Sequence, residues 1–359
     1  GTHRSLVGST SDAASNSLQL PVNTPDDSYA YVLVYTKSLL LEQRTGAAGA
    51  LEDNERNISI SFLDQDLDAL QLGGNISWNP PADISLISSY VAYLATNSSG
   101  EGRSQIGSDV PAGTDVILLP ADTDQGSFTH VLVYISSSMV EQTTPAFIEI
   151  LDSVANISDL NFSDQDLDLG QLGGPVAWTP SEDVQLIISF EVYLALDSIG
   201  SGRSLVGLAE VPGSPSIELA AETLLLSFAH VVVYASSVLA QQTTPTAVAI
   251  DDMSGQVQSI LFSDLDLDHG EIGGTVTWTA PSIVSLVTHY SVYLAADVVG
   301  AFRTQLGTDV EVASNELVVP PDTIRWTNGY LVVYLRSVLA EQTLPAGEVL
   351  VDASVTVAG

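Results

Sequence analysis

The stretch that decides the fold is FSDQDLDLGQLGGPVAWTP, from Phe162 to Pro180, and the chain carries three versions of it. The other two are FLDQDLDALQLGGNISW from Phe62 and FSDLDLDHGEIGGTVTW from Phe262, so the spacing is 100 residues (62, 162, 262). The same register continues through VYLAL, HVVVY and QQTTP in the second copy and through close equivalents in the others. A period of domain size indicates tandem domains.

The period divides the chain into three complete repeats with a partial repeat at each end. The N-terminal part matches only the back half of a repeat, because its YVLVY, from Tyr31, corresponds to HVLVY from His130. A unit of about 100 residues can bury its own core, but half a unit would expose its core and unpaired strand edges, so we expect a segment of a longer array. The alternative is that a neighbouring molecule supplies the missing strands. The boundaries are 1–52 (partial), 53–152 (first repeat), 153–252 (second repeat), 253–352 (third repeat) and 353–359 (the start of a next repeat).

Composition limits the environment and the partners. The formal net charge is −35, with nine basic residues and no cysteine. Such a charge excludes a nucleic-acid backbone or an anionic membrane as partner, and it suits a cation-rich medium. The lack of cysteine excludes disulfides and thiol chemistry. No apolar run approaches the roughly 18 residues of a membrane helix, so we expect no membrane insertion in this segment.

Five N-glycosylation sequons favour a secreted or cell-surface glycoprotein. Asn75 alternates with Ile76 on a predicted strand, and Asn161 alternates with Phe162, so both asparagines are expected to point outward. Chance occurrence in a chain rich in Ser and Asn is the alternative. The sequons are at Asn57, Asn75, Asn97, Asn156 and Asn161.

Apolar residues alternate with polar ones throughout, and no long stretch has the helical period. Segments such as SYVAYLA, HVLVY and PVAW are rich in β-formers and are bounded by Gly, Pro, Asp and Ser. Seven short strands per repeat predict an all-β chain of antiparallel sandwiches. Because the linkers between repeats are short, the domains should form an extended array, on the order of 100 Å for three domains. In the second repeat the strands are expected near 155–163, 174–179, 187–196, 204–208, 216–220, 229–237 and 245–251.

Several of these residues resemble a known family. Trp178 stands before Thr-Pro, an aromatic-x-x-Tyr strand runs from Phe190 to Tyr193, and an alternating late strand runs from His230 to Tyr234. With the last strand led by TTP, the pattern resembles fibronectin type III, although immunoglobulin-like sandwiches share much of it. The resemblance implies adhesion, spacing and matrix roles and no catalysis. The chain departs from the family at the start of the sixth strand, where a Tyr is usual and this sequence has Phe128, Phe228 and Asn328.

Three Asp residues follow the first strand of each repeat at alternating positions. Phe162 points inward, so a continued strand would place all three carboxylates in the core, which is prohibitive for unpaired charges. We therefore predict that the chain leaves the strand after the Phe. Leu67, Leu167 and Leu267 should then turn inward instead. The triplets are Asp64, Asp66, Asp68; Asp164, Asp166, Asp168; and Asp264, Asp266, Asp268.

Asp triplets on an irregular loop, followed by Gly-Gly, have the ligand spacing of a calcium loop, although the loop is not an EF-hand. Close like charges also repel one another unless a cation is present. We therefore predict calcium at the nine Asp residues. A solvated acidic loop in an acidic protein is the alternative.

A recurrent arginine occupies one position in every repeat. We predict that it contacts a carboxylate of a neighbouring domain or of another chain. The alternative is a surface salt bridge, which contributes little stability. The residues are Arg4, Arg103, Arg203 and Arg303.

No recurrent histidine set, phosphate loop, zinc motif or nucleotide fingerprint indicates an enzyme. The first hypothesis is a structural repeat segment of a long extracellular or cell-surface fibre or filament, with neighbouring repeats or copies of itself as partners. The second is an adhesive binding module that recognises glycans or matrix proteins. The third is the spacer arm of a larger enzyme. The loops 97–102, 197–202 and 297–302 diverge only modestly and do not decide between them.

Overall fold

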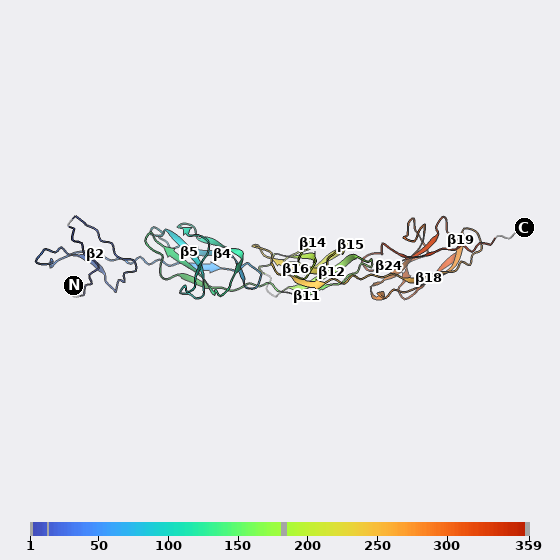
Figure 1. The fold of residues 1–359 in the computed structure, drawn as a ribbon, viewed down its shortest axis with the longest axis horizontal. Helices are drawn as coiled ribbons and strands as arrows, with labels where there is room; N and C mark the ends of the chain where they lie inside the picture. Colours follow the sequence, from blue (N-terminus) through green and yellow to red (C-terminus); the bar gives the residue numbers. More distant parts are fainter. Residues whose placement is uncertain (1–2, 13, 181–184, 356–359) are drawn as a thin grey trace. The chain divides into compact units, whose positions relative to one another are not determined.

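The computed structural model describes residues 3–12, 14–180 and 185–355. Within them all regular structure is β-strand apart from one 3-10 helix, η1 (Val284–Leu286), so the predicted all-β class is confirmed (Figure 1). Contacts divide the chain into two compact units. Unit 1 is residues 1–64 with 70–152, and unit 2 is residues 65–69 with 153–359. No helix in the described part has the length and apolar character needed to cross a membrane.

The second repeat, in unit 2, is an antiparallel sandwich of two sheets. One sheet has the order β11-β12-β15 and the other β14-β13-β16-β17. This architecture is the one that the resemblance to fibronectin type III implies, and the strands fall within a few residues of the predicted positions. They are β11 (Ile157–Phe162), β12 (Gln171–Pro180), β13 (Ser189–Ala195), β14 (Ser204–Glu210), β15 (Ser216–Leu224), β16 (His230–Ser236) and β17 (Thr246–Ala249).

The core lies between the two sheets because alternate side chains of each strand point inward. Val231 and Val233 of β16 are fully buried, and Trp178 packs edge-on against Phe190 with ring centroids 5.5 Å apart. These residues are the ones on which the sequence resemblance depended.

The third repeat, also in unit 2, has the same two sheets. Their orders are β18-β19-β23 and β21-β20-β24-β25, and β22 also pairs with β20. Two short strands, β21 and β22, thus take the place of the continuous β14. The strands are β18 (Gln258–Phe262), β19 (Glu271–Thr279), β20 (His289–Ala295), β21 (Thr304–Gln305), β22 (Val310–Glu311), β23 (Glu316–Ile324), β24 (Tyr330–Arg336) and β25 (Ala346–Val349).

Unit 1 holds most of the first repeat, with sheets β3-β4-β8 and β10-β9-β5-β6 and with β7 paired to β5. Its strands are β3 (Ser59–Phe62), β4 (Gln71–Asn79), β5 (Ser89–Ala95), β6 (Ser104–Gln105), β7 (Val110–Pro111), β8 (Val116–Asp124), β9 (His130–Ser136) and β10 (Ala146–Glu149).

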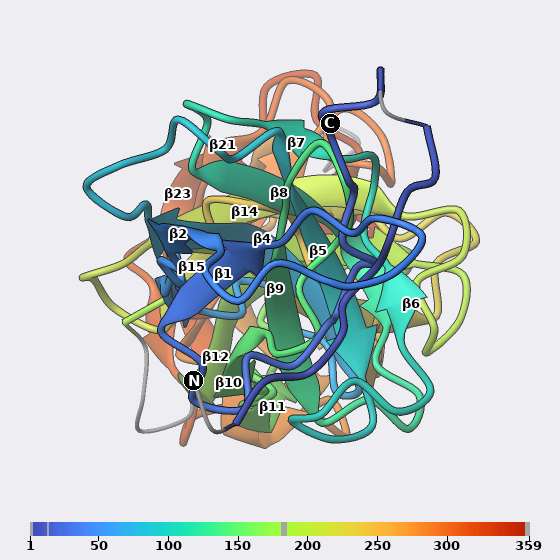
Figure 2. The same cartoon turned by 90° about the vertical axis from the view of Figure 1, so that its left-hand side faces the viewer.

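The N-terminal part forms one hairpin, in which β1 (Tyr31–Val34) pairs with β2 (Ala47–Ala50) (Figure 2). Tyr31 faces Ala50, which is the register in which His130 faces Glu149 in the first repeat. The strand β1 is exposed, whereas three of the four corresponding residues of β9 are buried. At the other end, residues 356–359 of the predicted next repeat lie outside the described residues.

The chain leaves the first strand of each repeat where the sequence predicted. The strands β3, β11 and β18 end at Phe62, Phe162 and Phe262, and the Asp residues follow in irregular loops. In the first copy, the loop segment Gln65–Ala69 belongs to unit 2, whereas the strands on either side of it belong to unit 1. The loop therefore interacts with residues outside its own repeat.

Candidate functional site

Asp164 opens the loop of the second repeat and is almost completely buried, with 2% of its surface exposed. Three backbone N–H groups donate to its carboxylate, from Asp166 (3.1 Å), Gly173 (2.9 Å) and Met253 (2.9 Å). Burial raises the pKa of Asp164 to about 6, and these N–H groups oppose the rise. The alternative of a solvated acidic loop is therefore wrong for this residue.

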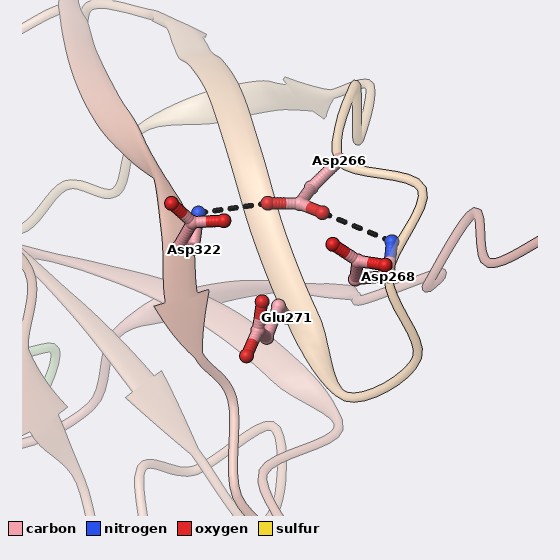
Figure 3. A group of neighbouring side chains, drawn as sticks. All are labelled: Asp266, Asp268, Glu271 and Asp322. Carbon is pink, nitrogen blue, oxygen red and sulfur yellow. Dashed lines mark hydrogen bonds between the residues drawn. The ribbon is translucent and has the colours of Figure 1, made fainter.

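Asp166 orders the next part of the loop. Its Oδ1 accepts the N–H of Asp168 at 3.0 Å, and its Oδ2 accepts the N–H of Glu222, on β15, at 2.8 Å. Asp266 does the same in the third repeat, with Asp268 at 3.0 Å and Asp322, on β23, at 2.7 Å (Figure 3). These bonds, the one from Asp268 first, lower the pKa of Asp266.

The third Asp holds the following repeat rather than its own loop. The carboxylate of Asp168 accepts the N–H groups of Thr343 at 2.7 Å and Leu344 at 3.2 Å. Both donors lie between β24 and β25 of the third repeat. Asp68, in unit 2, makes the same two bonds to the second repeat, with Thr243 at 2.6 Å and Thr244 at 3.0 Å.

The leucine between the second and third Asp enters the core of the following repeat. Leu167 is 3% exposed and packs in the cluster that contains Trp278 and Tyr290 of the third repeat. Leu67, in unit 2, packs in the core of the second repeat in the same way. Leu267 is 59% exposed. The leucines were predicted to turn inward, but two of them enter a neighbour's core and the third lies outside any core.

A glutamine of the following repeat forms hydrogen bonds across the same contact. Gln342 donates through Nε2 to the carbonyls of Leu167 (2.8 Å) and Gly255 (2.6 Å), and its Oε1 accepts the N–H of Leu335 (3.1 Å). Gln242 makes the equivalent bonds to Leu67, Ala155 and Ala235. We call residues 166–168 with residues 342–344 the junction. Sequence reasoning missed the glutamine, and the recurrent Gln-Thr before Pro was the signal for it.

Two clusters of carboxylates in unit 2 could hold a metal ion. One oxygen from each of Asp166, Asp168 and Glu222 lies within 4.8 Å of the others. Two oxygens that bind one Ca²⁺ at about 2.4 Å lie at most about 4.8 Å apart. The second cluster consists of Asp266, Asp268, Glu271 and Asp322 (Figure 3).

The carboxylates of each cluster repel one another. Burial, and then the charges of Asp166 and Asp168, raise the pKa of Glu222. Burial likewise raises the pKa of Glu271, with further contributions from the charges of Asp322, Asp266 and Asp268. A bound cation would remove this repulsion.

The clusters differ from the predicted ligand set. In unit 2, Asp164 and Asp264 lie outside both, since their carboxylates are occupied by backbone N–H groups. Asp64, in unit 1, accepts the N–H of Gly73 in the same way. The sequence interpretation missed an acidic residue on β8, β15 and β23, although this position is acidic in every repeat: Asp122, Glu222 and Asp322.

The recurrent arginine lies against its own repeat. Arg303 forms an ion pair with Glu341 at 2.7 Å, and its guanidinium lies over the rings of Tyr293 (4.5 Å) and Tyr334 (4.1 Å). The inter-domain carboxylate predicted from the sequence is therefore not the partner found, and a contact with another chain stays a prediction. The equivalent pairs are Arg4 with Glu42, Arg103 with Glu141 and Arg203 with Gln241.

Four of the five sequon asparagines, Asn57, Asn75, Asn156 and Asn161, are exposed. Asn97 is half-buried, and its Oδ1 accepts the N–H groups of Ser99 and Glu101, both at 3.1 Å. Asp197 and Asp297 cap the same turn in the other repeats. Asn97 thus has a structural role of its own, and glycosylation of the sequons stays a prediction.

Two of the solved structures that resemble this chain contain tandem domains or repeats. The crystal structure of the chicken CNTN1 FN1-FN3 domains is 12% identical, covering 81% of this chain and 97% of that one, with a TM-score of 0.24. The crystal structure of a tetra-tandem repeat in the extending region of a large adhesion protein is 15% identical, covering 89% of this chain and 80% of that one, with a TM-score of 0.23. At these scores the likeness carries no argument, and the fold class rests on the strand order. No family model and no curated protein matches the chain.

Proposed function

We propose that this chain is a structural, non-catalytic segment of a long extracellular or cell-surface fibre or filament, in which consecutive sandwiches interlock. Leu167 carries this proposal, because it is 3% exposed in the core of a repeat to which it does not belong in sequence. Withdrawing such a side chain would leave a cavity in the neighbour's core, which costs stability. The stability of the third repeat therefore depends on the second.

The contacts at the junction favour a rigid spacer over flexibly linked domains. Domains in one chain move relative to one another by default unless their interface is substantial and apolar. Here an apolar side chain enters the neighbour's core, and beside it the N–H groups of Thr343 and Leu344 donate charge-assisted hydrogen bonds to Asp168. We propose that 53–152, 153–252 and 253–352 are successive sandwich domains in an extended array, and that the second and third are each docked through the Asp-Leu-Asp loop of the repeat before it.

We propose an extracellular location for this fibre from its net charge and its exposed sequons. The exposed sequons and the net charge of −35 fit a glycosylated protein in a cation-rich exterior. We propose calcium as the cation that the carboxylate clusters take, because all their ligand atoms are oxygens. Extracellular modules typically bind calcium at roughly 10⁻⁴ to 10⁻³ M. Neighbouring repeats and further copies of the chain are the proposed partners.

Small-angle X-ray scattering of the full chain tests the interlock. Leu167→Asp places a charge in the core of the third repeat, and Leu267→Asp makes the same change at an exposed position. The wild type and Leu267→Asp should give the same rigid profile, with three domains reaching on the order of 100 Å. Leu167→Asp should broaden the distance distribution. A globular wild-type profile, or superimposable curves for all three proteins, would contradict the proposal.

A further inference from the structure

We propose that the second repeat binds one Ca²⁺ through Asp166, Asp168, Glu222 and Gln171, and that this ion strengthens the docking of the third repeat. The inference rests on the proposed function, which it deepens by naming the ligands and the element that the ion controls. Three of the residues form the carboxylate cluster already described. The fourth, Gln171, supplies an independent observation.

The side-chain oxygen Oε1 of Gln171 is shielded from solvent and has no hydrogen-bond partner among the described residues. Gln171 pairs with Leu224 at the start of β12, and Glu271 pairs with Ile324 at the start of β19, so the two occupy the same place in their sheets. Glu271 belongs to the carboxylate cluster of the third repeat. Gln171 therefore occupies the strand position from which the third repeat contributes a carboxylate, and we infer that its buried oxygen faces the cluster of the second repeat.

A buried oxygen needs a donor or a cation. At the equivalent position of the third repeat the neighbouring groups are carboxylates, which when ionised only accept hydrogen bonds. A second buried oxygen without a partner, Oδ1 of Asp252, lies in the same repeat, while Oδ2 of Asp252 accepts the N–H of Gly170 at 2.9 Å. In the third repeat, Asp352 takes this place and pairs with the guanidinium of Arg325 at 3.0 Å. The second repeat has Leu225 where the third has Arg325, so it lacks that positive charge.

The ligand set suits calcium better than other biological cations. All the candidate atoms are carboxylate or amide oxygens, which are the ligands of hard cations, and there is no nitrogen or sulfur ligand in the set. Mg²⁺ requires a near-ideal octahedron and usually keeps several waters, whereas Ca²⁺ accepts six to eight oxygens in irregular geometry. Asp166 and Asp168 are buried and Glu222 is exposed, so an ion can enter from the Glu222 side.

Asp168 links the ion to the junction. Its carboxylate belongs to the cluster and also accepts the N–H groups of Thr343 and Leu344. An ion that holds Asp168 in place therefore favours the docked third repeat, and docking favours the ion to the same extent. In the third copy the equivalent Asp268 is exposed, so an ion there affects no docked repeat within the described residues.

Calorimetric titration of the calcium-free full chain with CaCl₂ tests the ligand set. Glu222→Gln and Gln171→Met each remove one oxygen ligand, and we expect each to weaken one site at least tenfold while the other sites bind as in the wild type. Glu218→Gln makes the same charge change at an exposed position of the same strand, β15, and should bind like the wild type. MgCl₂ should compete only weakly.

Hydrogen exchange with and without CaCl₂ tests the coupling. Calcium should raise the protection of β24 amides in the wild type and in Glu218→Gln, and should do so at least tenfold less in Glu222→Gln. Wild-type calcium affinity in both Glu222→Gln and Gln171→Met, equal affinity for magnesium, or binding that leaves β24 unchanged would each overturn the inference. The interlock is judged separately, because Leu167→Asp should loosen the junction in calcium-free buffer whether or not an ion binds.

Discussion

Replacing Leu167 by alanine should destabilise the third repeat, although the residue belongs to the second. Its side chain is 3% exposed and packs in a core with Trp278 and Tyr290. Truncation of a leucine in such a core typically costs about 2–5 kcal/mol, because the apolar contact is lost and a cavity is left. Leu267→Ala makes the identical change at a side chain that is 59% exposed, and it should cost no more than about 0.5 kcal/mol.

Hydrogen exchange read by peptide is the suitable assay, because unfolding of a multidomain chain has no single free energy. At about 1.4 kcal/mol per tenfold, the expected loss corresponds to roughly 30- to 4,000-fold lower protection. It should appear in β20 and β24, with β13 and β16 little changed. Equal effects of Leu167→Ala and Leu267→Ala, or a loss confined to β13 and β16, would refute the reasoning.

Three further predictions follow from individual contacts. Gln342→Ala removes the side-chain donor to the Gly255 carbonyl and the acceptor of the Leu335 N–H, while the Leu167 carbonyl keeps the N–H of Gly255 at 3.3 Å. It should lower the stability of the third repeat by about 1–3 kcal/mol in the same exchange assay, and a change below about 0.5 kcal/mol would contradict this. Arg303→Ala removes an ion pair and contacts with two tyrosine rings and should cost about 1–2 kcal/mol within its own repeat, whereas unchanged stability with weakened assembly would restore the sequence-based prediction. Asn97→Asp should keep the turn that Asp197 caps in the second repeat and leave the exchange protection of β5 and of this turn nearly unchanged, while Asn97→Ala should lower that protection. Equal protection in the two variants would remove the capping role.

The fold could be predicted because each repeat expresses it locally. Alternation along strands such as 229–237 identified the buried face without reference to distant residues, and the observed β16 is His230–Ser236. The strand expected at 216–220 extends to Leu224. The strand pairing shifts register between Leu172 and Gly174, and such an irregularity interrupts the alternation on which a pattern-based boundary depends.

The candidate site could be predicted only in part. The three Asp residues alternate in step with the inward-facing Phe162, so a continued strand would bury them. This showed that the chain must leave the strand, and it does so after Phe162. The same parity could not identify whose core Leu167 enters, because the repeats are nearly alike and either core would accept a leucine. Glu222 could not be assigned to the cluster either, since the pairing of β12 with β15 brings it there from more than fifty positions along the chain.

Asp168 also explains why the second and third repeats dock in one particular geometry. Asp168 is buried, whereas the equivalent Asp268 is exposed, so the burial of this carboxylate comes from the following repeat and not from its own. A buried carboxylate without partners is strongly unfavourable. Its burial is tolerated only where the N–H groups of Thr343 and Leu344 meet it. Leu167 alone would fit many apolar surfaces, but the adjacent charge restricts it to a docking geometry that supplies those donors. We therefore expect the leucine to contribute affinity between the repeats through its apolar contacts and the aspartate to contribute specificity.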